Sequence, residues 1–226
     1  MSKNATDPNV IVLKGRLSYP ALYKPYQRKD DDGQSEGEPK YSATVLLDKA
    51  TAAEDIQKCK AIIKRVCEEQ WKGKTVKLKD GKQLAAGTNG SIVLMGICLR
   101  DGVEKDDKEG YGDGVMFVSA SCSMNRKPQV LQKKGGVFVE VPEETGLVYA
   151  GCNVAVSVRF WAQDNRYGKR VNAELRAVVF TGHNEPFGAA PVNVEEEFGD
   201  VDIPEDTGDE QPATSSSSKA ATTDEW

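Results

Sequence analysis

The sequence has little of what metal sites and disulfide frameworks require. Among 226 residues there is one histidine, His183, and the five cysteines include no pair at C-x-x-C spacing. Their odd number and wide spacing argue against a disulfide framework and against a zinc ribbon. We therefore predict no metal or other cofactor, and we expect the cysteines to be small buried side chains. They are Cys59, Cys67, Cys98, Cys122 and Cys152.

Long apolar runs are also missing. The longest, residues 92–99, has the length of a strand and falls far short of the ~18 residues that span a bilayer. The first residues are polar and lead into Asp7-Pro8, which predicts no signal peptide. With 38% hydrophobic and 29% charged residues, the composition is that of a globular protein. We expect no membrane partner and a cytoplasmic location in the cell that makes the protein.

Motifs of common catalytic sites are absent. The chain has no G-x-S-x-G, no phosphate-binding G-x-x-x-x-G-K-[ST], no H-E-x-x-H and no dinucleotide fingerprint after a strand. Its acidic clusters, such as the one in residues 101–114, fall in glycine-rich loops. A metal-dependent nuclease needs carboxylates fixed on strands or helices. We predict that the protein is not an enzyme; a nuclease is the less favoured alternative and would show metal-dependent cleavage.

Basic residues are nearly absent from the last part of the chain. Residues 195–226 contain eleven Asp or Glu and one basic residue, Lys219, for a charge of −10. The whole chain carries −5, so residues 1–194 carry +5. From Pro186 onward the chain is also rich in Ser, Thr and Pro, and we expect this part to be disordered. An acidic tail on a basic body can stand in for a polyanion.

The body of the chain predicts many strands and one helix. A stripe of apolar residues at three-to-four spacing predicts a helix at about 51–71, and the spacing Thr51-x-x-Glu54 predicts a capping box at its start. Period-two alternation predicts strands at 10–18, 40–47, 92–100, 115–125, 137–141, 152–161 and 170–181. Pro20 and Pro25 should block helix and regular strand pairing after the first strand. This census is typical of a small β-barrel or sandwich.

Aromatic and basic residues interleave in three separate segments. On the strand at 115–125 we expect an exposed polar face that carries Phe117. Cations can follow phosphates, and exposed rings can stack on bases at ~1–3 kcal/mol each without regard to sequence. A single strand of nucleic acid requires this combination. The candidate DNA-binding residues are Lys14, Arg16, Tyr19, Tyr23, Lys24, Tyr26, Arg28, Lys40, Phe117, Arg126, Lys127, Arg159, Trp161, Arg166, Tyr167, Lys169 and Arg170.

Any one of these rings has a plainer interpretation. A tyrosine near a sheet edge often packs on the core with its hydroxyl in water, and a tryptophan at a strand end is often half-buried. The set as a whole favours nucleic-acid binding, because the acidic tail is independent evidence that the body of the chain binds a polyanion.

The chain resembles the bacteriophage single-stranded DNA-binding proteins of the T7 type and related phage families. The residues that carry the resemblance are the acidic run at 195–210, the ending Asp224-Glu225-Trp226 and the block GRLSYPAL at 15–22. The T7-type tail usually ends in Phe, whereas this chain ends in Trp226, which leaves the identity of the docking partner open.

The resemblance implies a mainly β protein with an OB-fold-like five-stranded barrel, additional strands or hairpins and one helix. It implies a single-stranded DNA-binding domain at 1–188 and a disordered acidic tail at 189–226. Such proteins act in phage DNA replication, recombination and repair in the bacterial host cytoplasm. The tail competes for the DNA groove and recruits phage or host replication proteins, such as a polymerase or helicase–primase, through Asp224, Glu225 and Trp226. A homodimer and an annealing activity are also implied.

Two other functions stay open. The acidic tail could mimic DNA in a protein-interaction module that inhibits or recruits a DNA-processing enzyme; such a protein would bind that enzyme and no oligonucleotide. RNA binding is equally compatible with a stacking groove.

Overall fold

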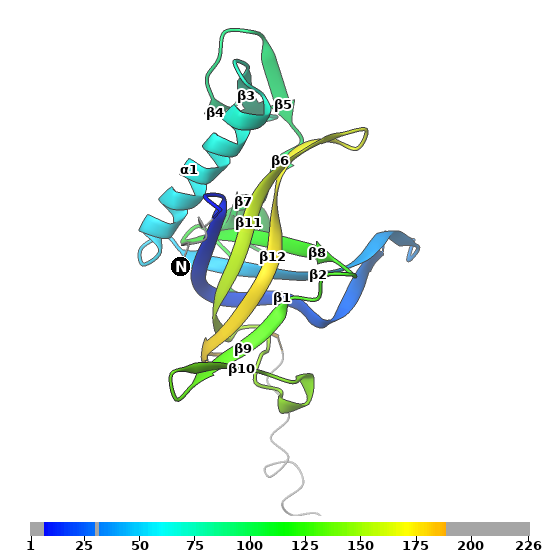
Figure 1. Cartoon of the computed structure of the whole chain (residues 1–226), viewed down its shortest axis with the longest axis vertical. Helices are drawn as coiled ribbons and strands as arrows, with labels where there is room; N and C mark the ends of the chain where they lie inside the picture. Colours follow the sequence, from blue (N-terminus) through cyan, green and yellow to red (C-terminus); the bar gives the residue numbers. More distant parts are fainter. Residues whose placement is uncertain (1–6, 30–31, 189–226) are drawn as a thin grey trace, which may run out of the picture. The chain divides into compact units, whose positions relative to one another are not determined.

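A computed structural model describes residues 7–29 and 32–188. The acidic tail, with Asp224, Glu225 and Trp226, lies outside the described residues. Five long strands close into a barrel (Figure 1). They are β1 (Val10–Lys29), β2 (Ser35–Asp48), β8 (Val115–Ser123), β11 (Asn153–Asn165) and β12 (Gly168–Gly182).

The barrel has the strand order β1-β2-β8-β12-β11, and β11 pairs again with β1. All neighbours are antiparallel except β8 and β12, which pair in parallel at Ala120–Ala173 and Ser121–Glu174. A closed five-stranded barrel with this parallel seam confirms the predicted OB-fold-like architecture.

Further elements surround the barrel. The helix α1 (Ala53–Gln70) packs against β11 and against a small sheet of order β4-β3-β5 (Figure 1). That sheet comprises β3 (Thr75–Leu78), β4 (Gln83–Ala85) and β5 (Ser91–Leu94). The barrel sheet also includes β6 (Gly96–Ile97), β7 (Leu99–Asp101), β9 (Gln129–Lys134) and β10 (Val137–Glu140). Two short 3-10 helices are η1 (Gly102–Lys105) and η2 (Glu143–Thr145).

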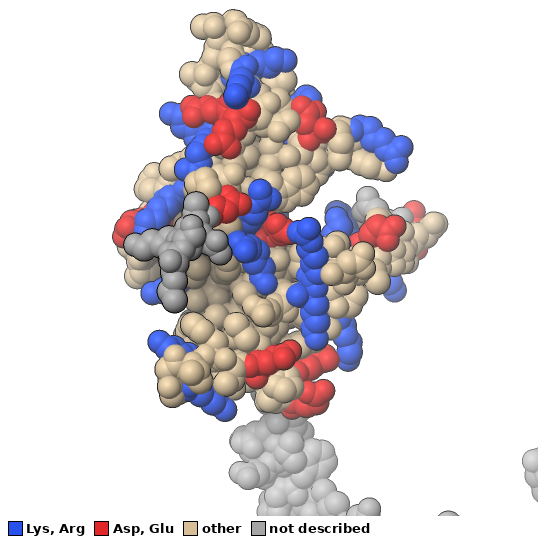
Figure 2. All heavy atoms as spheres, viewed as in Figure 1, with Lys and Arg blue, Asp and Glu red and all other residues tan. Residues whose placement is uncertain are grey.

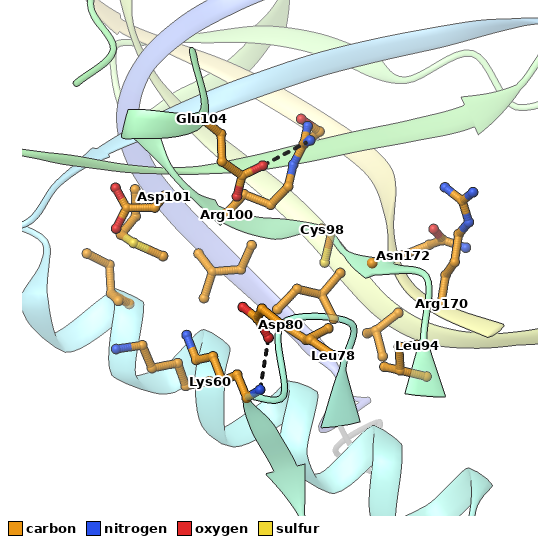
Figure 3. A pocket seen from close by; sticks show the side chains of 18 of the residues that line it. Lys60, Leu78, Asp80, Leu94, Cys98, Arg100, Asp101, Glu104, Arg170 and Asn172 are labelled. Atoms are coloured by element: carbon orange, nitrogen blue, oxygen red, sulfur yellow. Dashed lines mark hydrogen bonds and ion pairs between the residues drawn. The ribbon is translucent and has the colours of Figure 1, made fainter. Parts of the chain in front are cut away.

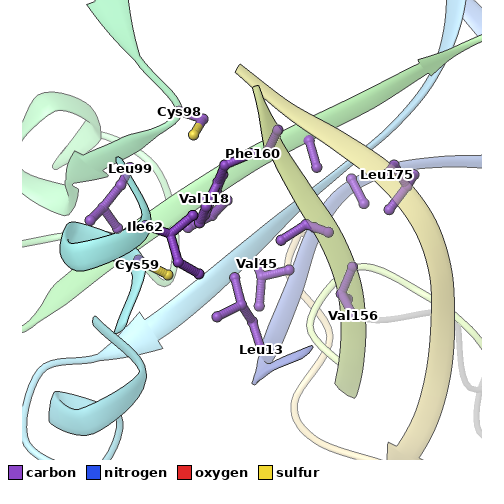
Figure 4. Packing of buried hydrophobic residues seen from close by; sticks show 14 of the residues in the cluster. Leu13, Val45, Cys59, Ile62, Cys98, Leu99, Val118, Val156, Phe160 and Leu175 are labelled. Carbon is purple, nitrogen blue, oxygen red and sulfur yellow. The ribbon is translucent and has the colours of Figure 1, made fainter. Parts of the chain in front are cut away.

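The core fills the barrel and extends under α1 (Figure 4). Alternate residues of the barrel strands point inward, for example Val118, Val156 and Phe160, which are all fully buried. Cys59 and Ile62 of α1 join the same cluster. All five cysteines are free and buried, as predicted. Burial raises the pKa of Cys59 to about 12, so it behaves as a small apolar side chain.

The helix begins differently from the prediction. The capping box is wrong: the N-cap residue is Ala52, and no side chain caps the helix. The carboxylate of Asp48, at the end of β2, instead accepts hydrogen bonds from the backbone N–H groups of Ala50 and Thr51, each at 2.9 Å. The last residue of β2 thus stabilises the turn before the helix, because β2 ends directly beside that turn.

Several predicted strands have other bounds. β1 continues to Lys29, and the two prolines disturb its pairing without ending it, because the register with β2 shifts after Ser18, Ala21 and Tyr26. The predicted strand at 92–100 is divided among β5, β6 and β7. The lysine-rich segment at 72–82 contains β3, which the sequence did not suggest, and β9 was also missed. Short strands offer few alternating positions: β10, with four residues, was predicted at 137–141, whereas β3 and β9, with four and six, were not.

Candidate nucleic-acid interface

Two adjoining hollows lie on one side of the barrel. The β11–β12 hairpin and the arm formed by the end of β1 and the start of β2 project on this side, with an open gap between them and Lys and Arg side chains on both (Figures 1 and 2). The smaller hollow, about 300 Å³, is here called the aromatic hollow and is lined by Lys40, Ser121, Trp161, Gln163, Tyr167, Arg170, Asn172 and Ala173. The larger, about 960 Å³, is called the basic pocket and lies among α1, the small sheet, β6–β8 and β12. Arg170 and Asn172 line both.

The alternation of β11 and β12 builds the aromatic hollow. Trp161 pairs with Asn172 across the hairpin, and both side chains lie on the outer face, opposite the buried Phe160 and Val171. The hairpin turns at Asn165–Gly168, where Gly168 has φ +105° and the Asn165 side chain accepts a hydrogen bond from the Tyr167 N–H at 3.0 Å. The turn therefore presents the ring of Tyr167 at the rim of the hollow.

The aromatic rings of this hollow are accessible. Trp161 is 39% exposed and Tyr167 66% exposed, so a ligand can reach both rings. The Arg166 guanidinium lies 4.7 Å from the Tyr167 ring centroid and donates to its hydroxyl at 2.6 Å. A stacked ring with a cation against it can contact a base and a phosphate together.

The hairpin is tied to neighbouring elements. The Trp71 indole N–H, just after α1, donates to the Asp164 carboxylate at 2.8 Å, and Lys169 forms an ion pair with the same carboxylate. Lys169 and then Trp71 lower the pKa of Asp164. The Met95 N–H, just after the small sheet, donates to the Lys169 carbonyl at 2.9 Å. These contacts hold the position of Trp161 and Tyr167 relative to α1 and the small sheet.

A second aromatic group lies beside η1, and here the expectation of an exposed Phe117 is wrong. Phe117 is fully buried, because Tyr111 packs edge-on against its ring at 5.2 Å and Arg100 covers it at 4.7 Å. The Lys105 ammonium lies 4.7 Å from the ring centroid of Tyr19, which is 51% exposed. Burial lowers the pKa of Lys105 below its ordinary value.

Five of the sequence candidates lie at the two hollows. Lys40, Trp161, Tyr167 and Arg170 line the aromatic hollow, and Arg28 lines the basic pocket with Arg170. Two more border them: Arg166 contacts Tyr167, and Tyr26, which is 60% exposed, is the register partner of Lys40.

Other candidates are engaged elsewhere. Three cations form ion pairs: Lys24 with Glu143, Arg126 with Glu174, and Arg159 with Asp7. Asp7 raises the pKa of Arg159, first through the hydrogen bond between them.

The remaining candidates also lie away from the two hollows. Tyr23 is half-buried with its hydroxyl in the interior, burial raises its pKa, and Lys127 lies 6.0 Å from its ring centroid. Lys14 is exposed opposite Ala155 on the β1–β11 side of the barrel. Arg16 donates to the backbone carbonyls of Gly151, before β11, and of Glu185, near the end of the described chain.

Most cations of the basic pocket were not predicted from the sequence. Its lining includes Lys49, Lys60, Lys79, Lys82 and Arg100, none of which was a candidate. Lys79 and Lys82 belong to the lysine-rich segment at 72–82, but their position in the pocket depends on the small sheet, which was not predicted. Lys60 could have been suspected only from its place on the polar side of the predicted helix.

Two negative findings concern residues 7–29 and 32–188. In this range no group of three or more His, Cys, Asp or Glu side chains is placed to hold a metal ion. Nor is any helix in the same range long and apolar enough to cross a membrane.

The comparisons with known proteins give the family. A protein-family model described as "Enterobacter phage Enc34, ssDNA-binding protein" matches residues 8–208. The chain belongs to this family. The match confirms the resemblance to phage single-stranded DNA-binding proteins that the sequence suggested.

Individual relatives agree with this assignment. Protein p50 of Acyrthosiphon pisum secondary endosymbiont phage 1 is 32% identical over 191 residues, which cover 84% of this chain and 92% of that protein. The single-stranded DNA-binding protein from bacteriophage Enc34, solved in complex with ssDNA, is 30% identical with a TM-score of 0.59, over 80% of this chain and 90% of that chain. A second solved structure, of the single-stranded DNA-binding protein from bacteriophage Enc34, is 29% identical, with a TM-score of 0.57, over 84% of this chain and 90% of that chain.

Proposed function

We propose that this protein binds single-stranded DNA without sequence specificity, with the aromatic hollow as its main contact. Family membership supports the ligand, since the Enc34 relative was solved in complex with ssDNA. The position of the hollow is the observation that supports the site. OB-folds bind oligonucleotides on the face of their second and third strands and at the loops that follow strands one and four. Here β2, β8 and the β11–β12 hairpin, which follows the fourth barrel strand, meet at Lys40, Ser121, Trp161 and Tyr167.

The chemistry of the hollow suits this ligand. Trp161 and Tyr167 offer faces on which bases can stack, at about 1–3 kcal/mol per base, and stacking does not depend on base identity. Lys40, Arg166 and Arg170 supply charge for the phosphates at the edge of the same surface. Binding by these groups needs no bond to be made or broken, so we propose no catalytic step.

We propose further that the chain divides into a DNA-binding domain at 1–188 and an acidic tail at 189–226. The tail charge of −10 at residues 195–226 against +5 for the rest supports competition between tail and DNA for the basic surface. The freed tail then recruits replication proteins through Asp224, Glu225 and Trp226. On this view the protein acts in phage DNA replication, recombination and repair in the host cytoplasm, and a homodimer is compatible with these roles.

The test is an anisotropy titration of labelled oligo-dT, with oligo-rU and duplex DNA as competitors. Trp161→Ala and Tyr167→Ala should each weaken oligo-dT binding by about 1–3 kcal/mol. Phe138→Ala is the matched control, because Phe138 is 61% exposed on β10, away from the hairpin tip (Figure 1). Equal affinities for all three variants and the unaltered protein would contradict the proposed site. Absence of any oligonucleotide binding, with capture of a DNA-processing enzyme, would favour the DNA-mimic alternative.

A further inference from the structure

The basic pocket has a second wall that does not belong to the barrel. α1 contributes Lys60 to it (Figure 3), and the turn between β3 and β4 contributes Lys79 and Lys82. The facing side is formed by β7, β8 and β12, with Arg100 and Arg170. A ligand in this pocket would therefore be held between the barrel on one side and α1 with the small sheet on the other.

The charge of the pocket is strongly positive. Seven cations line it against three carboxylates, those of Asp80, Asp101 and Glu104. Two of the carboxylates are engaged by cations of the same lining: Lys49 pairs with Asp101 at 2.9 Å, and Arg100 pairs with Glu104 at 3.4 Å. The third, Asp80, accepts a hydrogen bond from the backbone N–H of Lys82 at 2.8 Å.

The three lysines of the second wall are among the lining cations that these two ion pairs do not engage. Lys60, Lys79 and Lys82 are exposed, and none forms an ion pair with a described carboxylate. Lys58 and Lys64 on the same helix do form such pairs, with Glu54 and Glu68. The lysines on the pocket side of α1 and the small sheet thus remain available to an anion.

The floor of the pocket is apolar and continuous with the aromatic hollow. Leu78, Leu94 and Ile97 line it; Leu78 and Ile97 are only partly buried and offer apolar surface to bases whose phosphates lie at the charged rim. Arg170 and Asn172 line both spaces, and the Met95 N–H ties the end of the small sheet to Lys169 of the hairpin. A DNA strand that leaves the aromatic hollow past Arg170 would therefore enter the basic pocket.

We propose that single-stranded DNA continues from the aromatic hollow into the basic pocket, where Lys60, Lys79 and Lys82 bind its phosphates. This inference rests on the proposed function and adds a second wall to its site, built from α1 and the small sheet. It predicts that a long oligonucleotide engages more phosphates than a short one that fills the aromatic hollow alone.

The first test compares two triple variants with the same change of charge. One replaces Lys60, Lys79 and Lys82 by Ala; the control replaces Lys64, Lys133 and Lys134, which lie outside both hollows. Affinity for long oligo-dT is measured over a range of salt, and the occluded length is measured by tight-binding titration. The pocket variant should lose up to about 2 from the magnitude of its salt slope, at about 0.7 for each phosphate contact, and should occlude fewer nucleotides. A triple replacement by Arg should keep both values.

The second test uses the unaltered protein and so does not depend on the folding of a variant. Lysine acetylation is followed by mass spectrometry with and without long oligo-dT. Lys60, Lys79 and Lys82 should become protected, whereas Lys64, Lys133 and Lys134 should not.

Equal slopes and occluded lengths for the two triple variants, or equal acetylation with and without DNA, would overturn the second wall. If Trp161→Ala still weakens binding in that case, the proposed function stands and this inference alone fails.

Discussion

The Arg16 guanidinium lies 4.1 Å from the centroid of the Phe187 ring. It also donates hydrogen bonds to the carbonyls of Gly151 and Glu185. Phe187 in turn fits against Gly110, where a Cβ atom would come within 2.4 Å of its ring. Arg16 therefore holds the last described residues against the outside of the barrel. Its guanidinium is engaged by these contacts.

Arg16→Ala should consequently release this segment without weakening DNA binding in the aromatic hollow. We expect a lower free energy of unfolding in urea, since three contacts are lost, and an oligo-dT affinity close to that of the unaltered protein. Arg170→Ala is the comparison, because it removes the same charge from the lining of both hollows. A loss of affinity in Arg16→Ala as large as that in Arg170→Ala would show that Arg16 contacts DNA.

Phe117→Ala should act on stability. The ring is fully buried beneath Tyr111 and Arg100, so its removal should cost about 3–5 kcal/mol in the free energy of unfolding. Urea denaturation followed by circular dichroism measures this change. The folded variant should keep its affinity for oligo-dT; a large loss of affinity with little loss of stability would mean that the ring reaches a base.

Asp48→Ala should change how stability depends on pH. Hydrogen bonds from the backbone N–H groups of Thr51 and Ala50 lower the pKa of Asp48 below its ordinary value of 3.8. Because the folded-state pKa is the lower one, these bonds stabilise the fold above pH 3.8, and their contribution disappears as the pH falls through the folded-state pKa.

The urea midpoint of Asp48→Ala should therefore fall less steeply with acidification between about pH 5 and pH 2 than that of the unaltered protein. Asp106→Ala, in the exposed loop after η1, serves as a control for the removal of one negative charge. Parallel pH curves for Asp48→Ala and the unaltered protein would contradict this role for Asp48.

Removal of residues 189–226 should tighten binding to oligo-dT, most clearly at low salt. The reason is the charge of −10 at 195–226, which competes with phosphates for the basic surface. A full-length variant with the eleven acidic residues replaced by Asn or Gln separates charge from chain length and should behave like the truncation. Filter binding at two salt concentrations measures the effect, and an unchanged affinity would argue against competition.

The barrel could be predicted because its long strands each show a clear alternation of inward apolar residues. In β11, the apolar residues 154, 156, 158 and 160 occupy every second position, and the four are fully or almost fully buried in the structure. The same rule placed Val118 inward in β8. It failed for Phe117, which lies on the outer face as predicted but is covered by Tyr111, a residue of a loop that only the folded chain brings there. Alternation identifies the face of a strand and not what lies on top of it.

The candidate site was predictable in part for a similar reason. Trp161 and Tyr167 stand close together in the sequence on one hairpin, so their association needs only local structure. The second wall of the basic pocket depends on the pairing of β3 with β5, which joins residues sixteen apart through strands of four residues. Neither strand has a pattern that would reveal the pairing, and Lys60, Lys79 and Lys82 therefore looked like ordinary solvated lysines.

The hydrogen bond between the Trp71 indole and Asp164 has a practical consequence for spectroscopy. Trp71 is only 5% exposed, and its N–H is fixed to the hairpin that carries Trp161. Its emission should stay constant while the hairpin keeps its position and should change when the hairpin swings away. Trp161 faces the solvent side of the same hairpin and should respond to a ligand directly. Once Trp226 has been replaced by a non-emitting residue, Trp71 should thus report on movement of the hairpin and Trp161 on binding of a ligand.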